Sequence, residues 1–337
     1  MVNVLVTGGA GFIGSNFVRH ALAVHPDWRV TTLDKLTYAG RIESLRGVMD
    51  HPRHDFVKAD IADPSVSKPL VMASDLVVHF AAETHVDRAI ANAGEFIMTD
   101  VFGTFVLLEA AREAPRLRRF VQISTDEVYG SVAEGSSREG DELRPRNPYA
   151  ASKAGADRLA YSYWATYEVP VVIVRASNNY GPFQFPEKLI PLFVTNALDD
   201  LPLPLYGDGL NERDWLHVAD HCRALDVVID RGVSGQAYNV GGGNHVRNRD
   251  LTGKILQLLD KPASLVRHVQ DRPGHDRRYS LNTEKLRALG WTPAVDFDRG
   301  LAETIAWYRE NDWWWRPIKQ DDPAYKAYYQ AQYGQRG

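Results

Sequence analysis

The sequence contains a single cysteine, Cys222, among its 337 residues. One cysteine excludes an internal disulfide and a cysteine metal cluster, and it is usual in proteins of reducing compartments. No apolar run approaches the roughly 20 residues that a membrane-spanning helix requires. A signal-peptide pattern is also missing at the N-terminus. We therefore predict a cytoplasmic location.

The chain also lacks an excess of basic residues, because 39 Lys and Arg stand against 43 Asp and Glu. The formal net charge of −4 excludes the positive field that attracts nucleic acid or anionic membranes. The histidines are scattered without metal-ligand spacing, so we predict no metal site. With 44% hydrophobic and 24% charged residues, the composition indicates a globular chain, and its length suggests about two domains.

A glycine-rich turn directly after a short β-branched run is the first strong pattern. Val2–Thr7 is typical of a buried parallel strand, and it is followed by Gly8, Gly11 and Gly14. Such glycines permit a tight turn, close approach of the backbone to a pyrophosphate and packing of the next helix on the strand. The N-terminus of that helix offers free N–H groups to phosphates.

A second predicted strand, Arg29–Leu33, ends in Asp34, twenty residues beyond Gly14. A carboxylate at this position suits the ribose hydroxyls of a dinucleotide and repels a 2′-phosphate. A glycine triplet alone is more often an ordinary loop, but here the strand, the helix and the acid are all in place. The pattern predicts an NAD site and favours NAD over NADP.

Strand and helix signals go on alternating through the first half of the chain, which predicts a doubly wound parallel sheet of the Rossmann type. In such sheets, ligands bind at the carboxyl ends of the strands. We predict an α/β fold in which the NAD-binding domain takes residues 1–176, with return segments from about 205–243. A smaller α/β substrate-binding lobe takes mainly residues 177–318. The polar, tyrosine-containing residues 319–337 are predicted to form a peripheral tail.

The groups with the clearest catalytic potential follow one predicted strand: Thr125, Asp126 and Glu127. Further on, Tyr149 and Lys153 would share one face of a helix that begins at Tyr149. An ammonium beside a phenol lowers the phenol pKa and makes it a base near neutral pH. Tyr-x-x-x-Lys alone often marks an ordinary amphipathic helix. After a dinucleotide fingerprint and a hydroxyl residue, it indicates a catalytic pair.

Two segments of the second half gather cationic and aromatic side chains, residues 206–214 with Arg213 and residues 267–279 with Arg272. Arginine forks suit phosphate groups. Any single arginine is better interpreted as a solvated surface residue. Two clusters beside an NAD domain favour a second diphosphate, that of a substrate. We interpret the glycine run 241–243 as a flexible turn.

Several longer motifs resemble those of the nucleotide-sugar dehydratases of the extended short-chain dehydrogenase/reductase family, in particular the dTDP-glucose 4,6-dehydratases. The resemblance covers roughly residues 1–318. Its motifs are Thr7–Gly14, Leu33–Gly40, His79–Arg88, Ser124–Gly130, Asn178–Pro182, Pro186–Phe193 and Arg272–Tyr279. The adjacent acids Asp126 and Glu127 are the specific marker, because the related sugar epimerases lack this pair.

This resemblance implies a mechanism. Tyr149 takes the proton from the sugar C4 hydroxyl while the C4 hydride passes to NAD. Lys153 holds the phenolate and the nicotinamide ribose. Thr125 forms a hydrogen bond near the C4 oxygen. Glu127 is the expected base for the C5 proton, and a protonated Asp126 the expected acid for the departing C6 hydroxyl. Two close carboxyls should have pKa values pushed apart. Hydride then returns to C6, giving a 4-keto-6-deoxy sugar and NAD that stays tightly bound.

The resemblance also implies the site residues and a partner. The expected cofactor site consists of Gly8, Gly11, Phe12, Ile13, Gly14, Asp34, Lys35, Thr37, Gly40, Asp60, Ile61, Phe80, Ala81, Ala82, Thr99, Tyr149 and Lys153. The expected dTDP-glucose site consists of Thr84, Thr125, Asn178, Lys188, Leu189, Tyr206, Arg213, Asn248, Arg272, His275 and Tyr279, with Arg213 and Arg272 for the diphosphate. We expect a homodimer built on a four-helix bundle from about Ile97–Ala114 and Tyr149–Glu168.

Two positions depart from the family pattern, which usually has serine at Thr84 and asparagine at Asp100. Three alternatives stay open at this point. A 4-epimerase or decarboxylase on the same scaffold is disfavoured by Asp126 and Glu127, and a non-catalytic NAD-binding scaffold by the intact Tyr149 and Lys153. The choice between dTDP and UDP and the pathway of the product are not decided by the residues.

Overall fold

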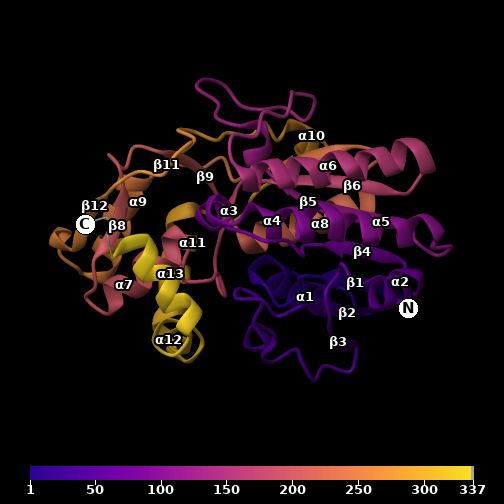
Figure 1. Ribbon diagram of the computed structural model, residues 1–337, viewed down its shortest axis with the longest axis horizontal. Coiled ribbons are helices and arrows are strands. Elements are labelled where there is room, and N and C mark those ends of the chain that lie inside the picture. Colours follow the sequence, from indigo (N-terminus) through magenta and orange to yellow (C-terminus); the bar gives the residue numbers. More distant parts are fainter. Residues whose placement is uncertain (335–337) are drawn as a thin grey trace.

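A seven-stranded parallel sheet forms the centre of the larger part of the molecule (Figure 1). The computed structural model describes residues 1–334. The strands lie in the order β10-β6-β5-β4-β1-β2-β3. Their bounds are β1 Val2–Thr7, β2 Trp28–Asp34, β3 His54–Lys58, β4 Leu76–His79, β5 Arg119–Thr125, β6 Val171–Ala176 and β10 Ala237–Val240. The predicted fold class is confirmed.

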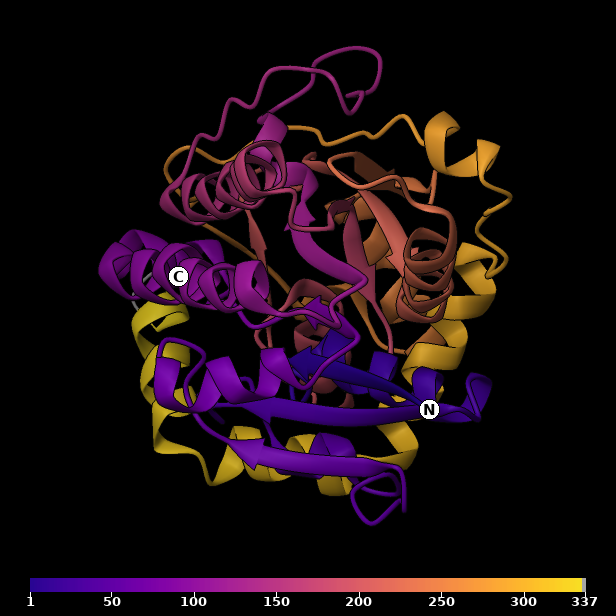
Figure 2. The same cartoon turned by 90° about the vertical axis from the view of Figure 1, so that its right-hand side faces the viewer.

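Helices cover both faces of this sheet (Figure 2). The alternation of side chains along β1 explains why, since Val4 and Val6 enter one apolar cluster and Leu5 the other. The first cluster is completed by α1 Phe12–Val24 and α8 Val218–Arg231, and the second by α2 Pro64–Met72, α5 Thr104–Glu113 and α6 Pro148–Tyr167. A strand buried on both faces must be apolar throughout, as β1 nearly is.

The long helix predicted over Ile97–Ala114 is present up to Glu113, but its first part is a π-helix. After α3 Val86–Ala91 and α4 Ala93–Phe96, the chain runs as a π-helix, η2 Ile97–Gly103, before α5 begins. The hydroxyl of Thr104 donates to the carbonyl of Asp100 at 2.5 Å, and a Cβ at Gly103 would meet Ile61 Cδ1 at 2.5 Å. Such π-segments often mark functional sites, and this one carries Asp100 beneath the loop that follows β4.

The smaller lobe has its own apolar core, which includes Phe193, Trp215, Leu251 and Trp315. Three short strands, β7 Asn178–Tyr180, β9 Glu212–His217 and β11 His245–Arg247, form one sheet, and β8 Leu203–Tyr206 pairs with β12 Val266–Val269. The helices of this lobe are α7 Leu189–Leu198, α9 Asn248–Leu259, α11 Phe297–Glu310, α12 Asp312–Gln320 and α13 Pro323–Tyr333. The remaining short elements are η1 Ile42–Leu45, η3 Asp126–Tyr129, η4 Ala263–Leu265 and α10 Glu284–Ala288.

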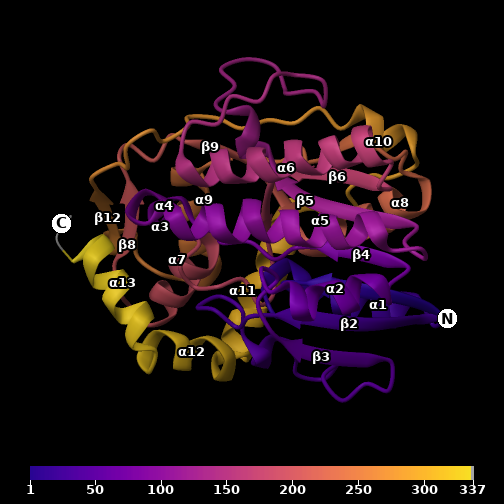
Figure 3. The ribbon, with the colours of Figure 1, turned by 45° about the vertical axis from the view of Figure 1, so that its right-hand side comes forward.

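The predicted peripheral tail differs from what the structure shows. Within its described part, α12 ends at Gln320 and α13 follows along the outer side of the smaller lobe toward β8 (Figure 3). Tyr325 is only 4% exposed, and its hydroxyl donates to the carbonyl of Pro186 at 3.1 Å. The segment looks polar in the sequence because tyrosine buries an apolar ring and still presents a polar atom. Residues 335–337 of the predicted tail lie outside the described residues.

None of the helices in residues 1–334 is both long and apolar enough to cross a membrane.

An ion pair inside the protein joins α6 to β6. Arg175 Nε lies 2.8 Å from Asp157 Oδ2, and the two side chains are 2% and 0% exposed. The guanidinium also donates to Tyr129 Oη at 2.7 Å. Hydrogen bonds and charge from Arg175 lower the pKa of Asp157 against the opposing effect of burial. The pair therefore fixes the end of β6 against the helix that carries Tyr149.

We expect Asp157→Asn to lower the free energy of unfolding by about 3–5 kcal/mol, because it leaves the Arg175 charge buried without its counter-ion. Urea unfolding at neutral pH measures this. The matched control is Arg158→Met: Arg158 also pairs with Asp157 but is 49% exposed, so its loss should cost less than about 1 kcal/mol. Equal costs for the two variants would contradict the importance of the buried pair.

Candidate active site

A deep cavity runs along the carboxyl ends of the sheet strands and continues between the sheet and the smaller lobe. Every residue that the sequence predicts for the cofactor, catalytic and substrate sites lines this one cavity. The placement follows from topology, because the parallel strands β1, β2, β4, β5 and β6 all end at the same edge of the sheet. The individual roles of these residues stay predictions.

The three glycines after β1 differ in their surroundings. Gly8 has φ +69°, and a Cβ there would lie 2.5 Å from Ala81 N. A Cβ on Gly14 would collide with the carbonyl of Gly8. At Gly11 the nearest atom to such a Cβ is Gly8 O at 3.2 Å, so its other side is open to the cavity. A tight turn, a packed helix and an exposed backbone are the features that fit a pyrophosphate.

The acid at the end of β2 is held rigidly. Asp34 is 7% exposed, and its two oxygens accept from Ala10 N at 2.9 Å and Leu36 N at 2.8 Å. Lys35, the nearest cation in sequence, is paired with Asp60 at 2.6 Å. A fixed carboxylate beside a neutralised lysine offers acceptors to ribose hydroxyls and no free charge to a 2′-phosphate. These residues fit the adenosine half of NAD.

The tyrosine and lysine lie as predicted on α6, but their electrostatics differ from the prediction. Burial raises the pKa of Tyr149 well above its usual value, and the charges of Glu127 and Asp100 raise it further. The ammonium of Lys153, which was expected to act on the phenol, donates to the backbone carbonyl of Ile123 at 2.7 Å. Desolvation and the nearby carboxylates determine the direction of the phenol pKa in this structure, and Lys153 is not among the groups that shift it. The role of Tyr149 as a base stays a prediction.

The two acids at the end of β5 have different surroundings. Asp126 is 3% exposed; burial, followed by the charge of Glu127, raises its pKa well above the ordinary value. Burial also raises the pKa of Glu127, but Arg213 and Arg272 oppose this effect. Arg213 opposes the rise at both carboxyls, whereas Arg272 and Lys188 act on Glu127, so the cations favour the ionised form of Glu127 more than that of Asp126. This difference has the direction that the expected acid and base roles require.

Several buried polar atoms in this cavity have no hydrogen-bond partner within residues 1–334: Asp126 Oδ2, Asn178 Oδ1, Asn248 Oδ1 and Arg272 Nε. Buried polar groups are almost always paired in folded proteins. Their concentration on the walls of one cavity indicates a polar ligand that supplies both donors and acceptors.

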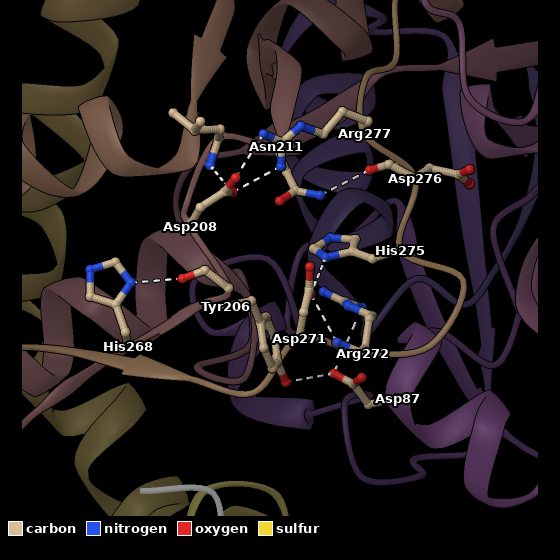
Figure 4. A network of polar contacts seen from close by, with 12 residues as sticks. Asp87, Tyr206, Asp208, Asn211, His268, Asp271, Arg272, His275, Asp276 and Arg277 are labelled. Carbon is tan, nitrogen blue, oxygen red and sulfur yellow. Dashed lines mark hydrogen bonds and ion pairs between the residues drawn. The ribbon is translucent and has the colours of Figure 1, made fainter.

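Among the arginines of the predicted clusters, Arg213 and Arg272 face the cavity. Figure 4 shows Arg272 beside Asp87, at 3.7 Å, while Tyr206 donates to the same carboxylate at 3.2 Å. Arg213 is 7% exposed, and its guanidinium stacks 4.4 Å from the centre of the Tyr279 ring. In contrast, Arg277 pairs with Asp208 at 2.8 Å on the exterior (Figure 4). The cavity therefore has two arginines suited to a diphosphate.

Sequence reasoning missed some residues of the cavity. Asn147 caps α6 and donates to Glu127 at 3.5 Å; its place just before Pro148 is a helix-start signal that could have revealed it. Glu83, whose pKa is raised to about 7 chiefly by burial, lies within a motif that the resemblance already included. Tyr333 had no signal at all, because it belongs to the segment predicted as a tail.

Residues 1–334 contain no cluster of three or more His, Cys, Asp or Glu that could hold a metal ion.

The buried acid should destabilise the fold at neutral pH. Since the folded protein keeps the Asp126 proton at pH values where the unfolded chain has lost it, folding becomes less favourable as pH rises above about 4. Asp126→Asn removes this cost and should raise the free energy of unfolding at pH 7.5 by about 1–3 kcal/mol. The gain should vanish below about pH 4, where both states are protonated.

Urea unfolding at the two pH values measures the effect, and Glu127→Gln is the matched comparison. It should stabilise less, because neighbouring cations already compensate the Glu127 carboxylate. If Glu127→Gln gave the larger gain, the order of the two pKa values would be reversed.

Comparison with known proteins agrees with this geometry. The family model described as GDP-mannose 4,6 dehydratase matches residues 5–304. A dTDP-glucose 4,6-dehydratase of Streptomyces niveus is 51% identical over 328 residues, which are 96% of this chain and 97% of the relative. The crystal structure of a dTDP-glucose 4,6-dehydratase from Streptomyces venezuelae with NAD bound superposes with a TM-score of 0.92 at 53% identity, covering 94% of this chain and 100% of that chain.

The same fold also occurs in sugar epimerases, which catalyse a different reaction. A UDP-glucose 4-epimerase of Thermus thermophilus, solved in complex with NAD, has a TM-score of 0.84 at 31% identity, over 92% of this chain and 99% of that chain. Fold alone therefore does not separate dehydratase from epimerase, whereas sequence identity over the whole length does. The chain belongs to the nucleotide-sugar 4,6-dehydratase family, and within it to the dTDP-glucose 4,6-dehydratases.

Proposed function

We propose that this chain is a hydro-lyase that converts dTDP-glucose to dTDP-4-keto-6-deoxyglucose for deoxysugar biosynthesis, with NAD as its bound cofactor. The observation that carries the proposal is the acid pair Asp126 and Glu127, held at the end of β5 in the same cavity as the glycine-rich turn. Relatives that share about half of its residues over nearly the whole chain have this activity in their names. Loss of water needs an acid and a base at once, and oxidation or epimerisation does not.

The first proton is handled on α6. In the proposed reaction Tyr149 removes the proton of the C4 hydroxyl, and Thr125 lies near the C4 oxygen. Burial raises the pKa of Tyr149, and hydrogen bonding from Thr125 opposes that rise. Lys153 lies within the same helix, anchored on the carbonyl of Ile123, where its positive charge would support the phenolate. NAD, when bound, supplies the acceptor for the C4 hydride and the donor that later reduces C6.

Elimination falls to the acid pair. With a ketone at C4, the hydrogen on C5 becomes acidic, and Glu127 is placed in this proposal to take it. Asp126, which holds its proton, gives that proton to the C6 hydroxyl, so that one water leaves and a C5–C6 double bond forms. The later protonation of C5 returns the Glu127 proton. Burial, which raises the pKa of both acids, supports a protonated Asp126, and the cations around Glu127 support its role as the base.

The substrate half of the cavity has groups for the rest of the nucleotide sugar. Arg213 and Arg272 are proposed to bind the diphosphate, and Lys188 donates to Thr84 Oγ1 at 3.1 Å near the sugar end. The departure from serine at Thr84 thus keeps its hydroxyl in use. We propose the domain assignment that the sequence predicts. Residues 1–176 and a return segment bind NAD, and mainly residues 177–318 bind the nucleotide sugar.

We also propose a homodimer. Large apolar side chains are exposed along η2 and α5, where Ile97 is 50% and Met98 54% exposed, and Tyr167 at the end of α6 is 47% exposed. Monomers seldom expose such patches without a partner, and two helices from each subunit would bury this one. A cytoplasmic location is proposed as well, supported by the single, buried Cys222.

Light scattering coupled to gel filtration should give twice the chain mass, and Met98→Asp should shift it toward the monomer because a charge cannot be buried there unpaired. Leu258→Asp is the control, an apolar residue that is 45% exposed on α9 of the smaller lobe. A wild-type protein that is monomeric at micromolar concentration would contradict the dimer.

Incubation with dTDP-glucose, followed by mass spectrometry and NMR, tests the activity. We expect a product that has lost one water and carries a C4 ketone and a C6 methyl group. UDP-glucose in a parallel reaction ranks the two bases. A C4 epimer without loss of water would replace the dehydratase proposal with an epimerase.

Glu127→Gln separates the steps. The variant should still oxidise C4, seen as NADH absorbance that appears on addition of substrate, but its overall turnover should fall by about 10²–10⁴-fold because the C5 base is gone. Asn147→Ser is the partner variant: serine can still cap α6, but it lacks the amide that donates to Glu127, and the change should cost far less. Normal dehydration by Glu127→Gln would show that another group removes the C5 proton.

A further inference from the structure

The loop of residues 35–41, between β2 and η1, is attached at both ends to the part of the cavity that fits a dinucleotide. Leu36 lies in the left-handed region with φ +57°, and its backbone N–H donates to the Asp34 carboxylate at 2.8 Å. At the other end, the N–H of Arg41 donates to the carbonyl of Ala10, in the glycine-rich turn, at 3.0 Å. A leucine is strained in this backbone conformation and keeps it only where surrounding contacts hold it.

Tyr38, in the middle of this loop, reaches across to the other half of the cavity. Its ring packs against the apolar core of the smaller lobe, edge-on to Phe185 with ring centres 5.5 Å apart. Its hydroxyl donates to the carbonyl of Thr84 at 2.7 Å. Burial, followed by the charge of Glu187, raises the pKa of Tyr38 well above its usual value, so the hydroxyl keeps its proton and remains a donor.

The acceptor of this hydrogen bond belongs to the expected substrate site. Thr84 Oγ1 accepts from Lys188 Nζ at 3.1 Å, so Thr84 is held by Tyr38 at its carbonyl and by Lys188 at its hydroxyl. The next residue, His85, has φ +88°, again in the region that favours glycine. A strained residue therefore stands on either side of the Tyr38–Thr84 hydrogen bond, Leu36 in one loop and His85 in the other. Such strain is typical of functional segments whose conformation depends on their contacts.

A buried ion pair holds the Tyr38 ring in place. Arg88, on α3, lies over this ring at 3.7 Å from its centre and pairs with Glu187 at 3.0 Å. Glu187 is 3% exposed and directly precedes Lys188 in the chain. Tyr38 is therefore in contact with both segments that carry the expected sugar-binding groups, the loop after β4 and the segment before α7.

From this arrangement we propose that Tyr38 is a positioning residue that couples the two ligands of the cavity: through its hydrogen bond to Thr84, binding of the dinucleotide and binding of the sugar strengthen each other. The inference rests on the proposed function, which assigns both ligands to this cavity. A ligand that orders one of the two loops also orders the other through this bond, so the second ligand loses less conformational freedom when it binds. By linkage, each ligand raises the affinity for the other by the same factor.

Tyr38→Phe tests the coupling, because it removes the hydroxyl and leaves the ring between Phe185 and Arg88. The measurement is the rate at which the purified holoenzyme exchanges its NAD for isotope-labelled NAD, with and without saturating dTDP-4-deoxy-4-fluoroglucose. This analogue keeps the sugar ring but has no C4 hydroxyl, so it cannot be oxidised to the ketone. We expect the analogue to slow NAD exchange about fivefold more in the wild type than in Tyr38→Phe, the scale of one hydrogen bond.

Tyr238→Phe is the matched control. Tyr238 is also buried and its hydroxyl also bonds to the backbone, accepting from Val233 N at 2.8 Å, but it does not line the cavity. This control should keep the wild-type effect of the analogue on NAD exchange. Titration calorimetry of the analogue into the holoenzymes should give a Kd about fivefold above wild type for Tyr38→Phe, and a wild-type Kd for Tyr238→Phe.

An equal effect of the analogue on NAD exchange in wild type and Tyr38→Phe would overturn the inference, because the sugar would then only block the exit of the cofactor. An equal loss of the effect in Tyr238→Phe would overturn it as well. If wild type bound the analogue but did not dehydrate dTDP-glucose, the proposed function would fail while the exchange rates still decided the coupling. If wild type bound neither the dTDP nor the UDP form of the analogue, Thr84 and Lys188 would have no sugar to hold, and the inference would fall too.

Discussion

Two carboxyl groups adjacent in sequence, and kept from water at the end of one strand, create the constraint on which the cavity depends. Asp126 and Glu127 cannot both ionise without compensation in such a place, because each charge is desolvated and repels the other. The compensation comes from the other lobe, where Arg213 and Lys188 face Glu127, together with Arg272. Electrostatic attraction between these cations and the Glu127 carboxyl therefore links the two lobes across the cavity. The cations also favour the charged form of Glu127 over that of Asp126, so the same interaction serves stability and the proposed chemistry.

The position of this pair follows from ordinary backbone rules. β5 is buried from Phe120 onward, with Gln122 its one polar residue between Phe120 and Ser124. The hydroxyl of Thr125 then accepts from Glu127 N at 3.3 Å and turns the chain into η3. The helix α6 starts at Pro148 under an Asn147 cap, with Ala150 N donating to Asn147 Oδ1 at 2.8 Å. The cap thus fixes where Tyr149 stands, and the same asparagine reaches Glu127. A strand end and a helix start are sufficient to bring an acid pair and a phenol to one point.

Much of this could be predicted from the sequence because it depends on local patterns. The glycine spacing, Asp34 at a strand end and the Tyr149–Lys153 spacing each reflect one turn or one helix, and all their residues line the cavity. Effects that depend on the tertiary environment could not be predicted. The pKa of Tyr149 is raised by burial and by carboxylates from other elements of the fold, and Lys153 is not among the groups that shift it. Likewise, α13 looked peripheral because its buried face consists of tyrosines, whose partners lie more than a hundred residues away in sequence.

The unusual acid at Asp100 shows how such an environment accommodates a departure from the family pattern. Its two oxygens accept from two donors, the backbone N–H of Glu83 at 2.8 Å and the hydroxyl of Ser152 at 2.6 Å. An asparagine has only one oxygen and could satisfy only one of these donors as an acceptor. Burial raises the Asp100 pKa to about 6, while the charge of Lys153 opposes that rise. The lost amide donor is therefore offset by a second accepted hydrogen bond and a nearby cation, and the carboxylate in turn favours the charged form of the lysine on which the proposed chemistry relies.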